Sequence, residues 1–168
     1  MELYILRHAK ADPLGIGGVG RDKDRALTDE GIATLRWVVR GMKALGLTFD
    51  LILSSPYLRA RQTAEIVAEE LDVRKILELS PELAPGGDCR VLIDTMSTRC
   101  DPSASILLVG HEPTLSRLIS VLISGDERTG INLKKAGLCK VTIGTLRYGR
   151  CAMLEWLLAP AQMKRIRP

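Results

Sequence analysis

Short, mainly apolar runs recur along the chain, and longer stretches with a helical spacing of apolar residues separate them. An uninterrupted apolar run is typical of a strand that is buried on both faces of a sheet. We expect such strands at residues 2–6, 49–55, 76–77 and 105–110. Residues 137–158 instead alternate around the turn "YGR", which predicts an antiparallel hairpin.

Helices are expected between these strands. Residues 27–46 carry an apolar stripe, with Thr28 as the predicted N-cap and Gly46 as the stop. Ser55 is the predicted N-cap of the next helix, and Pro56 its first helical residue, where a missing N–H costs nothing. Further helical stretches are residues 55–72, 89–97 and 113–124. This order predicts one domain over residues 1–168, a three-layer α/β/α structure whose central sheet is mainly parallel with an antiparallel edge.

The amino-acid composition limits the kinds of molecule that the protein is expected to bind. Apolar residues make up 46% of the chain and charged residues 26%, which is ordinary for a globular protein. The excess of basic over acidic residues, 24 against 20, favours anionic partners only weakly, and the low aromatic content argues against a surface that stacks nucleic-acid bases. No apolar run approaches the ~20 residues of a membrane span, and no signal-peptide pattern opens the chain. We therefore expect a cytoplasmic protein that binds neither nucleic acid nor membrane.

The sequence also argues against a metal or a nucleotide cofactor. The four cysteines form no C-x-x-C pair, and the two histidines lie about a hundred residues apart, so we expect reduced thiols and no zinc site. "GIGGVG" (Gly15–Gly20) matches the dinucleotide-binding fingerprint, but that motif must lie directly between a strand and a helix. Here residues 9–14 precede it and "RDKDRALTDEG" delays the helix, so a mobile loop is the better interpretation. No phosphate-binding loop motif of nucleotide-driven kinases is present either.

Three of the predicted strands end in polar residues. These pairs are Arg7–His8, Ser54–Ser55 and Gly110–His111, and Arg59 follows in the first turn of the next helix. Ligands of open α/β sheets bind at the carboxyl ends of the strands, so these groups should meet at one edge. A single histidine at a strand end is more often a structural hydrogen-bonding group. Two histidines with two arginines instead favour phosphoryl chemistry, because guanidinium groups bind phosphoryl oxygens in pairs and a neutral imidazole can attack phosphorus.

Five motifs resemble one known family. They are "LRHAKA" at 6–11, "RALTDEG" at 25–31, "SSPYLRARQTA" at 54–64, "SPELAPGGD" at 80–88 and "VGHEPTL" at 109–115. In type and order they are similar to the histidine phosphatase superfamily, which has the phosphoglycerate-mutase-like fold, and within it to the small SixA-type phosphohistidine phosphatases. The resemblance implies that His8 is the nucleophile and that Arg7, Arg59 and His111 complete the phosphate pocket. Ala9 is a departure, since many members have glycine after the histidine.

The proton donor is open at this point. Members of the superfamily that act on alkyl phosphates use a carboxylic acid to protonate the leaving group. Glu82 of "PELAPGG" stands where the resemblance places that acid, and Glu112 beside His111 is a second candidate. Each could equally be a solvated loop carboxylate. Imidazole leaves phosphorus more easily than an alkoxide, so a phosphohistidine phosphatase could work without either acid.

Three functions compete on the sequence alone. The first is a phosphatase that removes phosphate from phosphohistidine on a protein. The second is a phosphatase or mutase for a small phosphate ester, of which the mutase is disfavoured because the chain has little length left to enclose a substrate. The third is a module that binds phosphorylated partners without turnover. An intact His8 argues against this module, because binding needs only the cations.

Overall fold

The protein is described by a computed structural model that covers residues 1–13 and 21–166. The glycine-rich motif at Gly15–Gly20, and with it the prediction of a mobile loop there, lies outside the described residues.

A six-stranded sheet forms the centre of the molecule. Its strand order is β3-β2-β4-β1-β5-β6, and the first four of these are mutually parallel, whereas β5 is antiparallel to both of its neighbours, β1 and β6. The bounds are β1 Glu2–Arg7, β2 Leu51–Ser54, β3 Leu77–Leu79, β4 Ser105–Gly110, β5 Leu138–Ile143 and β6 Ala152–Leu158. The predicted fold class is confirmed, including the antiparallel edge.

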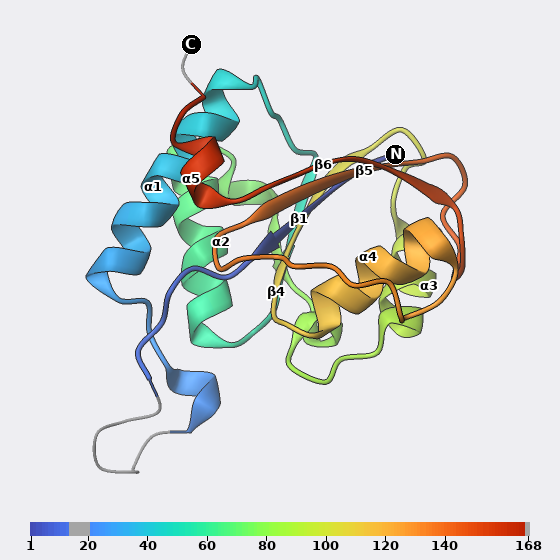
Figure 1. Cartoon of the computed structure of the whole chain (residues 1–168), viewed down its shortest axis with the longest axis horizontal. Coiled ribbons are helices and arrows are strands. Elements are labelled where there is room, and N and C mark those ends of the chain that lie inside the picture. Colours follow the sequence, from blue (N-terminus) through green and yellow to red (C-terminus); the bar gives the residue numbers. More distant parts are fainter. Residues whose placement is uncertain (14–20, 167–168) are drawn as a thin grey trace.

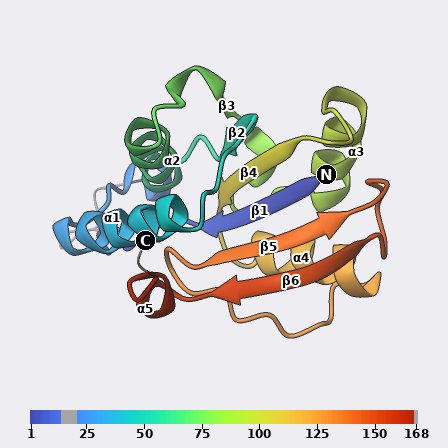
Figure 2. The same ribbon diagram turned by 90° about the horizontal axis from the view of Figure 1, so that it is seen from above.

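Helices cover both faces of this sheet (Figures 1 and 2). On one face lie α1 (Asp29–Ala44), α2 (Leu58–Glu70) and α5 (Pro160–Met163). On the other face lie α3 (Cys89–Arg99) and α4 (Thr114–Ser124). The described residues also form three short 3₁₀ turns: η1 (Asp22–Asp24), η2 (Arg74–Ile76) and η3 (Pro81–Leu83). In the described part of the chain, none of the helices has the length and apolar character needed to cross a membrane.

A core of buried residues lies on each face of the sheet, and this explains why β1 is a continuous apolar run. Successive side chains of a strand point to opposite faces of a sheet. Tyr4 and Leu6 therefore pack into the core under α1 and α2, whereas Leu3 and Ile5 pack into the core under α3 and α4. Each fully buried Leu or Ile contributes roughly 1.5–3 kcal/mol relative to an exposed side chain. The strand needs apolar residues on both faces, and only its end is free to carry polar groups.

The start of α1 agrees with the sequence. The Gly31 N–H donates to Thr28 Oγ1 at 3.0 Å, so Thr28 is the N-cap. A Cβ on Gly31 would stand 2.1 Å from the carbonyl oxygen of Lys10, so glycine is needed where α1 touches the segment after β1. Gly46 has φ +64° and ends the helical region as predicted.

The start of α2 corrects the sequence analysis. The helix begins at Leu58 with Tyr57 as its N-cap, so Ser55 is not the cap and Pro56 is not the first helical residue. Ser55 Oγ does accept the N–H of Tyr57, at 3.2 Å, but its second partner is His111. The serine is thus used for a contact between distant segments, and the helix starts later.

Smaller differences concern lengths. The predicted strand 49–55 is Leu51–Ser54, the third strand lies at Leu77–Leu79, and α3 extends to Arg99. The hairpin of β5 and β6 is confirmed, with residues 144–151 as a connection longer than the "YGR" turn and a register shift between Lys140 and Val141. The short α5 was not predicted.

Candidate active site

The ends of β1, β4 and β2 form one edge of the sheet. These strands are adjacent and parallel, so His8, His111 and Ser55 follow neighbouring carboxyl ends. Sheet-like hydrogen bonds continue past the strand ends, since the N–H of His8 donates to Gly110 O at 3.0 Å and the N–H of Ser55 donates to Val109 O at 2.9 Å. The sheet itself therefore fixes the positions of these residues.

The predicted residues come together at this edge. The rings of His8 and His111 lie with their centroids 4.9 Å apart, and Arg59 Nε is 3.3 Å from His8 Nε2. Both histidines and Arg59 are buried, with exposed fractions of 7%, 2% and 5%. Arg7 is close enough for its charge to lower the pKa of both histidines, and its Nη1 donates to Leu133 O at 2.9 Å.

The hydrogen bonds of His8 define its tautomer. Its Nδ1 lies 2.7 Å from the carbonyl oxygen of Ala9, which can only accept, so Nδ1 carries the proton. Nε2 then keeps its lone pair and accepts the Nε–H of Arg59. Ala9 is held in turn by Thr63, because the Ala9 N–H donates to Thr63 Oγ1 at 3.1 Å. Ala9 is fully buried in a core cluster, so the small methyl group is accommodated where many relatives have glycine.

Ser55 defines the tautomer of His111. Ser55 Oγ lies 2.8 Å from His111 Nε2 and already accepts the N–H of Tyr57. Among the described residues, His111 Nε2 is the one acceptor hydrogen-bonded to the Ser55 hydroxyl, so we assign Ser55 as the donor and Nε2 as the acceptor. His111 Nδ1 therefore carries a proton, and this N–H is buried without a protein partner. Sequence analysis missed this role, although the serine follows a buried strand in the same way as His8.

Both histidines are neutral at physiological pH. Burial, assisted by the charges of Arg59 and Arg7 and opposed by the hydrogen bond to Ala9, lowers the pKa of His8 to about 4. Burial also lowers the pKa of His111 to about 3, assisted by His8 and Arg59. A neutral His8 has an unprotonated Nε2 whose lone pair can attack once the Arg59 Nε–H turns to the phosphoryl group, and a neutral His111 has one N–H to donate.

Three buried side-chain atoms in the described part of the chain have no hydrogen-bond partner, and all belong to this edge. They are Arg7 Nε, His111 Nδ1 and Glu112 Oε1. Buried polar groups normally have partners, so such atoms are costly unless a ligand uses them. Two of the three are donors beside Arg59, a set that suits an oxyanion.

The two candidate acids differ in their contacts. Glu82 lies in η3, which packs against the end of β4, because a Cβ on Gly110 would stand 3.2 Å from Leu83 O. Its Oε2 accepts from Ser80 Oγ at 2.7 Å, and no hydrogen bond joins it to the histidines or arginines. Glu112 adjoins His111, and its charge raises the pKa of Arg7, which burial lowers.

Asp22 is the further residue that sequence analysis missed. Its carboxylate and its backbone carbonyl both accept hydrogen bonds from Arg59, at 3.0 and 2.7 Å. Nothing in the charged segment "RDKDR" distinguishes this aspartate from Asp24, two residues later.

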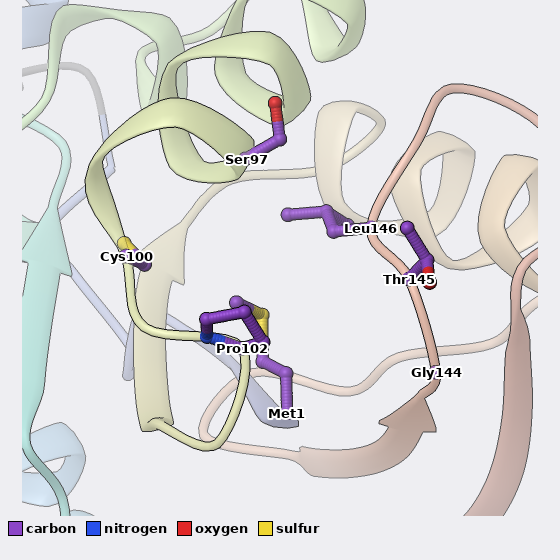
Figure 3. Close-up of a pocket in the computed structure, with 7 residues that line it drawn as sticks. All are labelled: Met1, Ser97, Cys100, Pro102, Gly144, Thr145 and Leu146. Carbon is purple, nitrogen blue, oxygen red and sulfur yellow. The ribbon is translucent and has the colours of Figure 1, made fainter.

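Two hollows near the sheet ends differ in chemistry. A groove of about 450 Å³ adjoins the site through Tyr57, whose ring lies 5.4 Å from that of His111. Its lining residues are Lys23, Asp24, Pro56, Tyr57, Leu58 and Arg61. A smaller cavity of about 120 Å³ lies at the opposite edge, where β1 begins and β5 ends, between Met1, Cys100 and Leu146 (Figure 3). No basic side chain lines this cavity, so it does not suit a phosphoryl group.

The residues described by the structure include no group of three histidine, cysteine or acidic side chains placed to hold a metal ion.

Comparisons with known proteins agree with this geometry. The family model of the histidine phosphatase superfamily (branch 1) matches residues 3–84. An uncharacterised protein of Picosynechococcus is 36% identical over 154 residues, which cover 88% of each chain. Phosphohistidine phosphatase SixA of Escherichia coli is 27% identical over 165 residues, 98% of this chain and 97% of that protein. A structure of the protein histidine phosphatase SixA complexed with tungstate superimposes with a TM-score of 0.82 at 26% identity, covering 96% of this chain and 98% of the other. The chain therefore belongs to the histidine phosphatase superfamily as a SixA-type member, and it is an enzyme of that kind.

Proposed function

We propose that this phosphatase acts, as a single domain, on phosphohistidine carried by a protein, and that His8 becomes transiently phosphorylated. The observation that carries the proposal is the state of His8. Its proton is fixed on Nδ1 by the Ala9 carbonyl, and its Nε2 lone pair points toward Arg59. The name of the SixA relatives supports the substrate, since they are phosphohistidine phosphatases.

The reaction then proceeds in two displacements. His8 Nε2 attacks phosphorus, the P–N bond of the substrate breaks, and the leaving imidazole takes a proton from solvent or from an acid at the edge of the site. Water then attacks the phosphorus bound to His8, the P–N bond to His8 breaks, and Nε2 regains its lone pair. Inorganic phosphate is released, and the proton given up by the water stays on the phosphate or passes to solvent. Arg7, Arg59 and the Nδ1–H of His111 stabilise the charge on the phosphoryl oxygens in both steps.

An exposed approach to the site supports a protein substrate. The groove beside Tyr57 is open to solvent, and it is lined by both basic and apolar side chains. A side chain that projects from a folded partner can reach the site through such a groove. Imidazole is also a good leaving group and does not depend on a strong proton donor. This fits a site in which Glu82 is hydrogen-bonded to Ser80 and not to either histidine.

One comparison tests the substrate. Phosphate release from a phosphohistidine protein is measured beside a panel of sugar and glycerate phosphates. We expect kcat/KM to be highest for the phosphohistidine protein. A higher value for a small ester would assign the enzyme to metabolite hydrolysis. No turnover of any substrate would leave the third function, a module that binds phosphorylated partners without hydrolysing them.

A second experiment tests the intermediate. A brief quench with ³²P-labelled substrate should trap label that is acid-labile and base-stable, as a phosphoramidate is. The His8→Asn variant should trap none. Stoichiometric label in that variant would remove His8 from the mechanism.

A further inference from the structure

We propose that Asp22 is a positioning residue of the catalytic site, which orients the Arg59 guanidinium so that one edge faces His8 Nε2. The inference rests on the proposed function only in taking His8 as the atom that receives the phosphoryl group. It concerns a residue that lies on a separate turn, 37 positions before the arginine.

The contacts of Arg59 divide its guanidinium into two edges. Nη1 donates to the backbone carbonyl of Asp22 at 2.7 Å, and Nη2 donates to Asp22 Oδ2 at 3.0 Å. The edge between these two nitrogens is therefore occupied by Asp22. Nε donates to His8 Nε2, so the edge formed by Nε and the second N–H of Nη2 faces the nucleophile. This second edge is the one that would grip a phosphoryl group bound to His8.

Asp22 is itself held in place. Its second oxygen, Oδ1, accepts from Arg25 Nη1 at 3.0 Å, and Arg25 Nε donates to the carbonyl oxygen of Asp12 at 2.6 Å. The segment after η1 is fixed to α2, because the N–H of Leu27 donates to Gln62 Oε1 at 2.8 Å. The support of Arg59 is thus anchored to the segment after β1 and to α2, independently of any ligand.

The charge state of Asp22 suits this role. Burial acts to raise the pKa of Asp22, but the hydrogen bonds from Arg25 and Arg59 outweigh it and hold the pKa below its usual value. The carboxylate is therefore ionised at neutral pH. The side chain of Arg59 is 6% exposed, so the pair is shielded from solvent on the arginine side and is not an ordinary surface ion pair.

An alternative use of the same contact makes the opposite prediction. If Asp22 occupied the edge of Arg59 that binds phosphate, it would compete with the substrate, and its removal would tighten oxyanion binding. The two edges described above favour positioning. In that case removal of Asp22 lets the guanidinium rotate, and both oxyanion affinity and kcat should fall.

The test compares Asp22→Ala, Asp22→Asn and the control Glu69→Ala. Glu69 lies near the end of α2, outside the groove beside Tyr57, and pairs with Arg74 at 2.5 Å, so its loss removes the same charge but leaves Arg59 untouched. Binding is measured with tungstate, and turnover with p-nitrophenyl phosphate, so neither readout requires a phosphohistidine substrate. Thermal unfolding of each variant shows whether the fold is retained.

We expect Asp22→Ala to lower kcat by about 10- to 100-fold, the loss typical of a misplaced catalytic group, and to weaken tungstate binding. Asp22→Asn keeps an oxygen acceptor and should recover most of this loss, whereas Glu69→Ala should stay within about twofold of the parent, as removal of an exposed pair does. The ¹⁵N resonance of Arg59 Nε should shift in Asp22→Ala and not in the control.

Three results would overturn the proposal. Tighter tungstate binding in Asp22→Ala would make Asp22 a competitor of the phosphoryl group. Equal losses in Asp22→Ala and Glu69→Ala would show an effect of charge and not of orientation. Unchanged kcat and tungstate affinity in Asp22→Ala would remove the residue from the site altogether. If the parent enzyme binds tungstate but does not hydrolyse phosphohistidine, the proposed substrate fails, and the role of Asp22 is still decided by the binding data.

Discussion

Acidification should destabilise the enzyme through its two buried histidines before any carboxylate contributes. The pKa values are about 4 for His8 and about 3 for His111 in the folded chain, against an ordinary value of 6.5. Between these values the unfolded chain binds more protons than the folded one. Stability is therefore full above about pH 6.5 and falls as the pH decreases toward the folded-state pKa values.

The magnitude follows from the two pKa values. At about pH 5 an unfolded histidine is largely protonated, whereas His8 and His111 remain largely neutral in the fold. Linkage gives a loss of about 2 kcal/mol for each histidine, or about 4 kcal/mol together, relative to neutral pH. This is a large part of the 5–15 kcal/mol that typically stabilises a domain. Carboxylates with a lowered pKa, such as Asp22 and Glu2, keep their contribution above their ordinary pKa values and lose it only as the pH falls below these toward the lowered folded-state pKa.

Urea unfolding between about pH 7 and pH 5 measures this effect. The parent enzyme should lose about 4 kcal/mol, and His8→Asn and His111→Asn should each lose about half as much, because one titrating group is gone. The pH dependence is compared within each variant, so a constant cost of the substitution does not affect it. If both variants show the same pH dependence as the parent, the histidines titrate normally and the argument for a neutral nucleophile fails.

Other substitutions test the individual contacts. Ser55→Ala removes the donor that fixes the tautomer of His111, so we expect kcat/KM to fall by about 10- to 100-fold. The ¹⁵N shifts of the His111 ring should show a mixture of tautomers, and unchanged shifts would contradict the assignment. Arg59→Lys should cost roughly 2–4 kcal/mol of transition-state stabilisation, because an ammonium cannot bind two oxygens as a guanidinium does, and a rate within threefold of the parent would count against the two-edge geometry. Glu82→Gln should slow hydrolysis of an alkyl phosphate far more than hydrolysis of phosphohistidine; equal losses would mean that Glu82 is not the leaving-group acid.

Sequence patterns predicted the sheet and the meeting of its polar ends, because both follow from local rules. A strand buried on both faces must be apolar, and parallel strands must end at the same edge. The sequence alone could therefore predict that His8, His111 and Arg59 lie close together. The predicted start of α2 was wrong because Ser55 looked like a cap, and only its contact with His111, 56 residues away, shows its other use.

Asp22 could not be found in the same way. Its partner Arg59 lies on another element, and the residues around it are all charged, so no pattern singles it out. The sequence also could not decide between Glu82 and Glu112 as the candidate proton donor. The difference between them is a hydrogen bond from Ser80 in one case and a buried oxygen beside His111 in the other.

The continuation of the sheet hydrogen bonds beyond the ends of β1 and β2 has an evolutionary consequence. His8 and Ser55 are fixed by the backbone of β4, whereas the groove residues Lys23 and Arg61 belong to η1 and to the outer side of α2. Substitutions and insertions in those outer segments leave the backbone bonds of the sheet intact. The residues proposed for phosphoryl transfer and the groove proposed to receive the partner can thus diverge separately, and one architecture can pass from one phosphorylated substrate to another without rebuilding its chemistry.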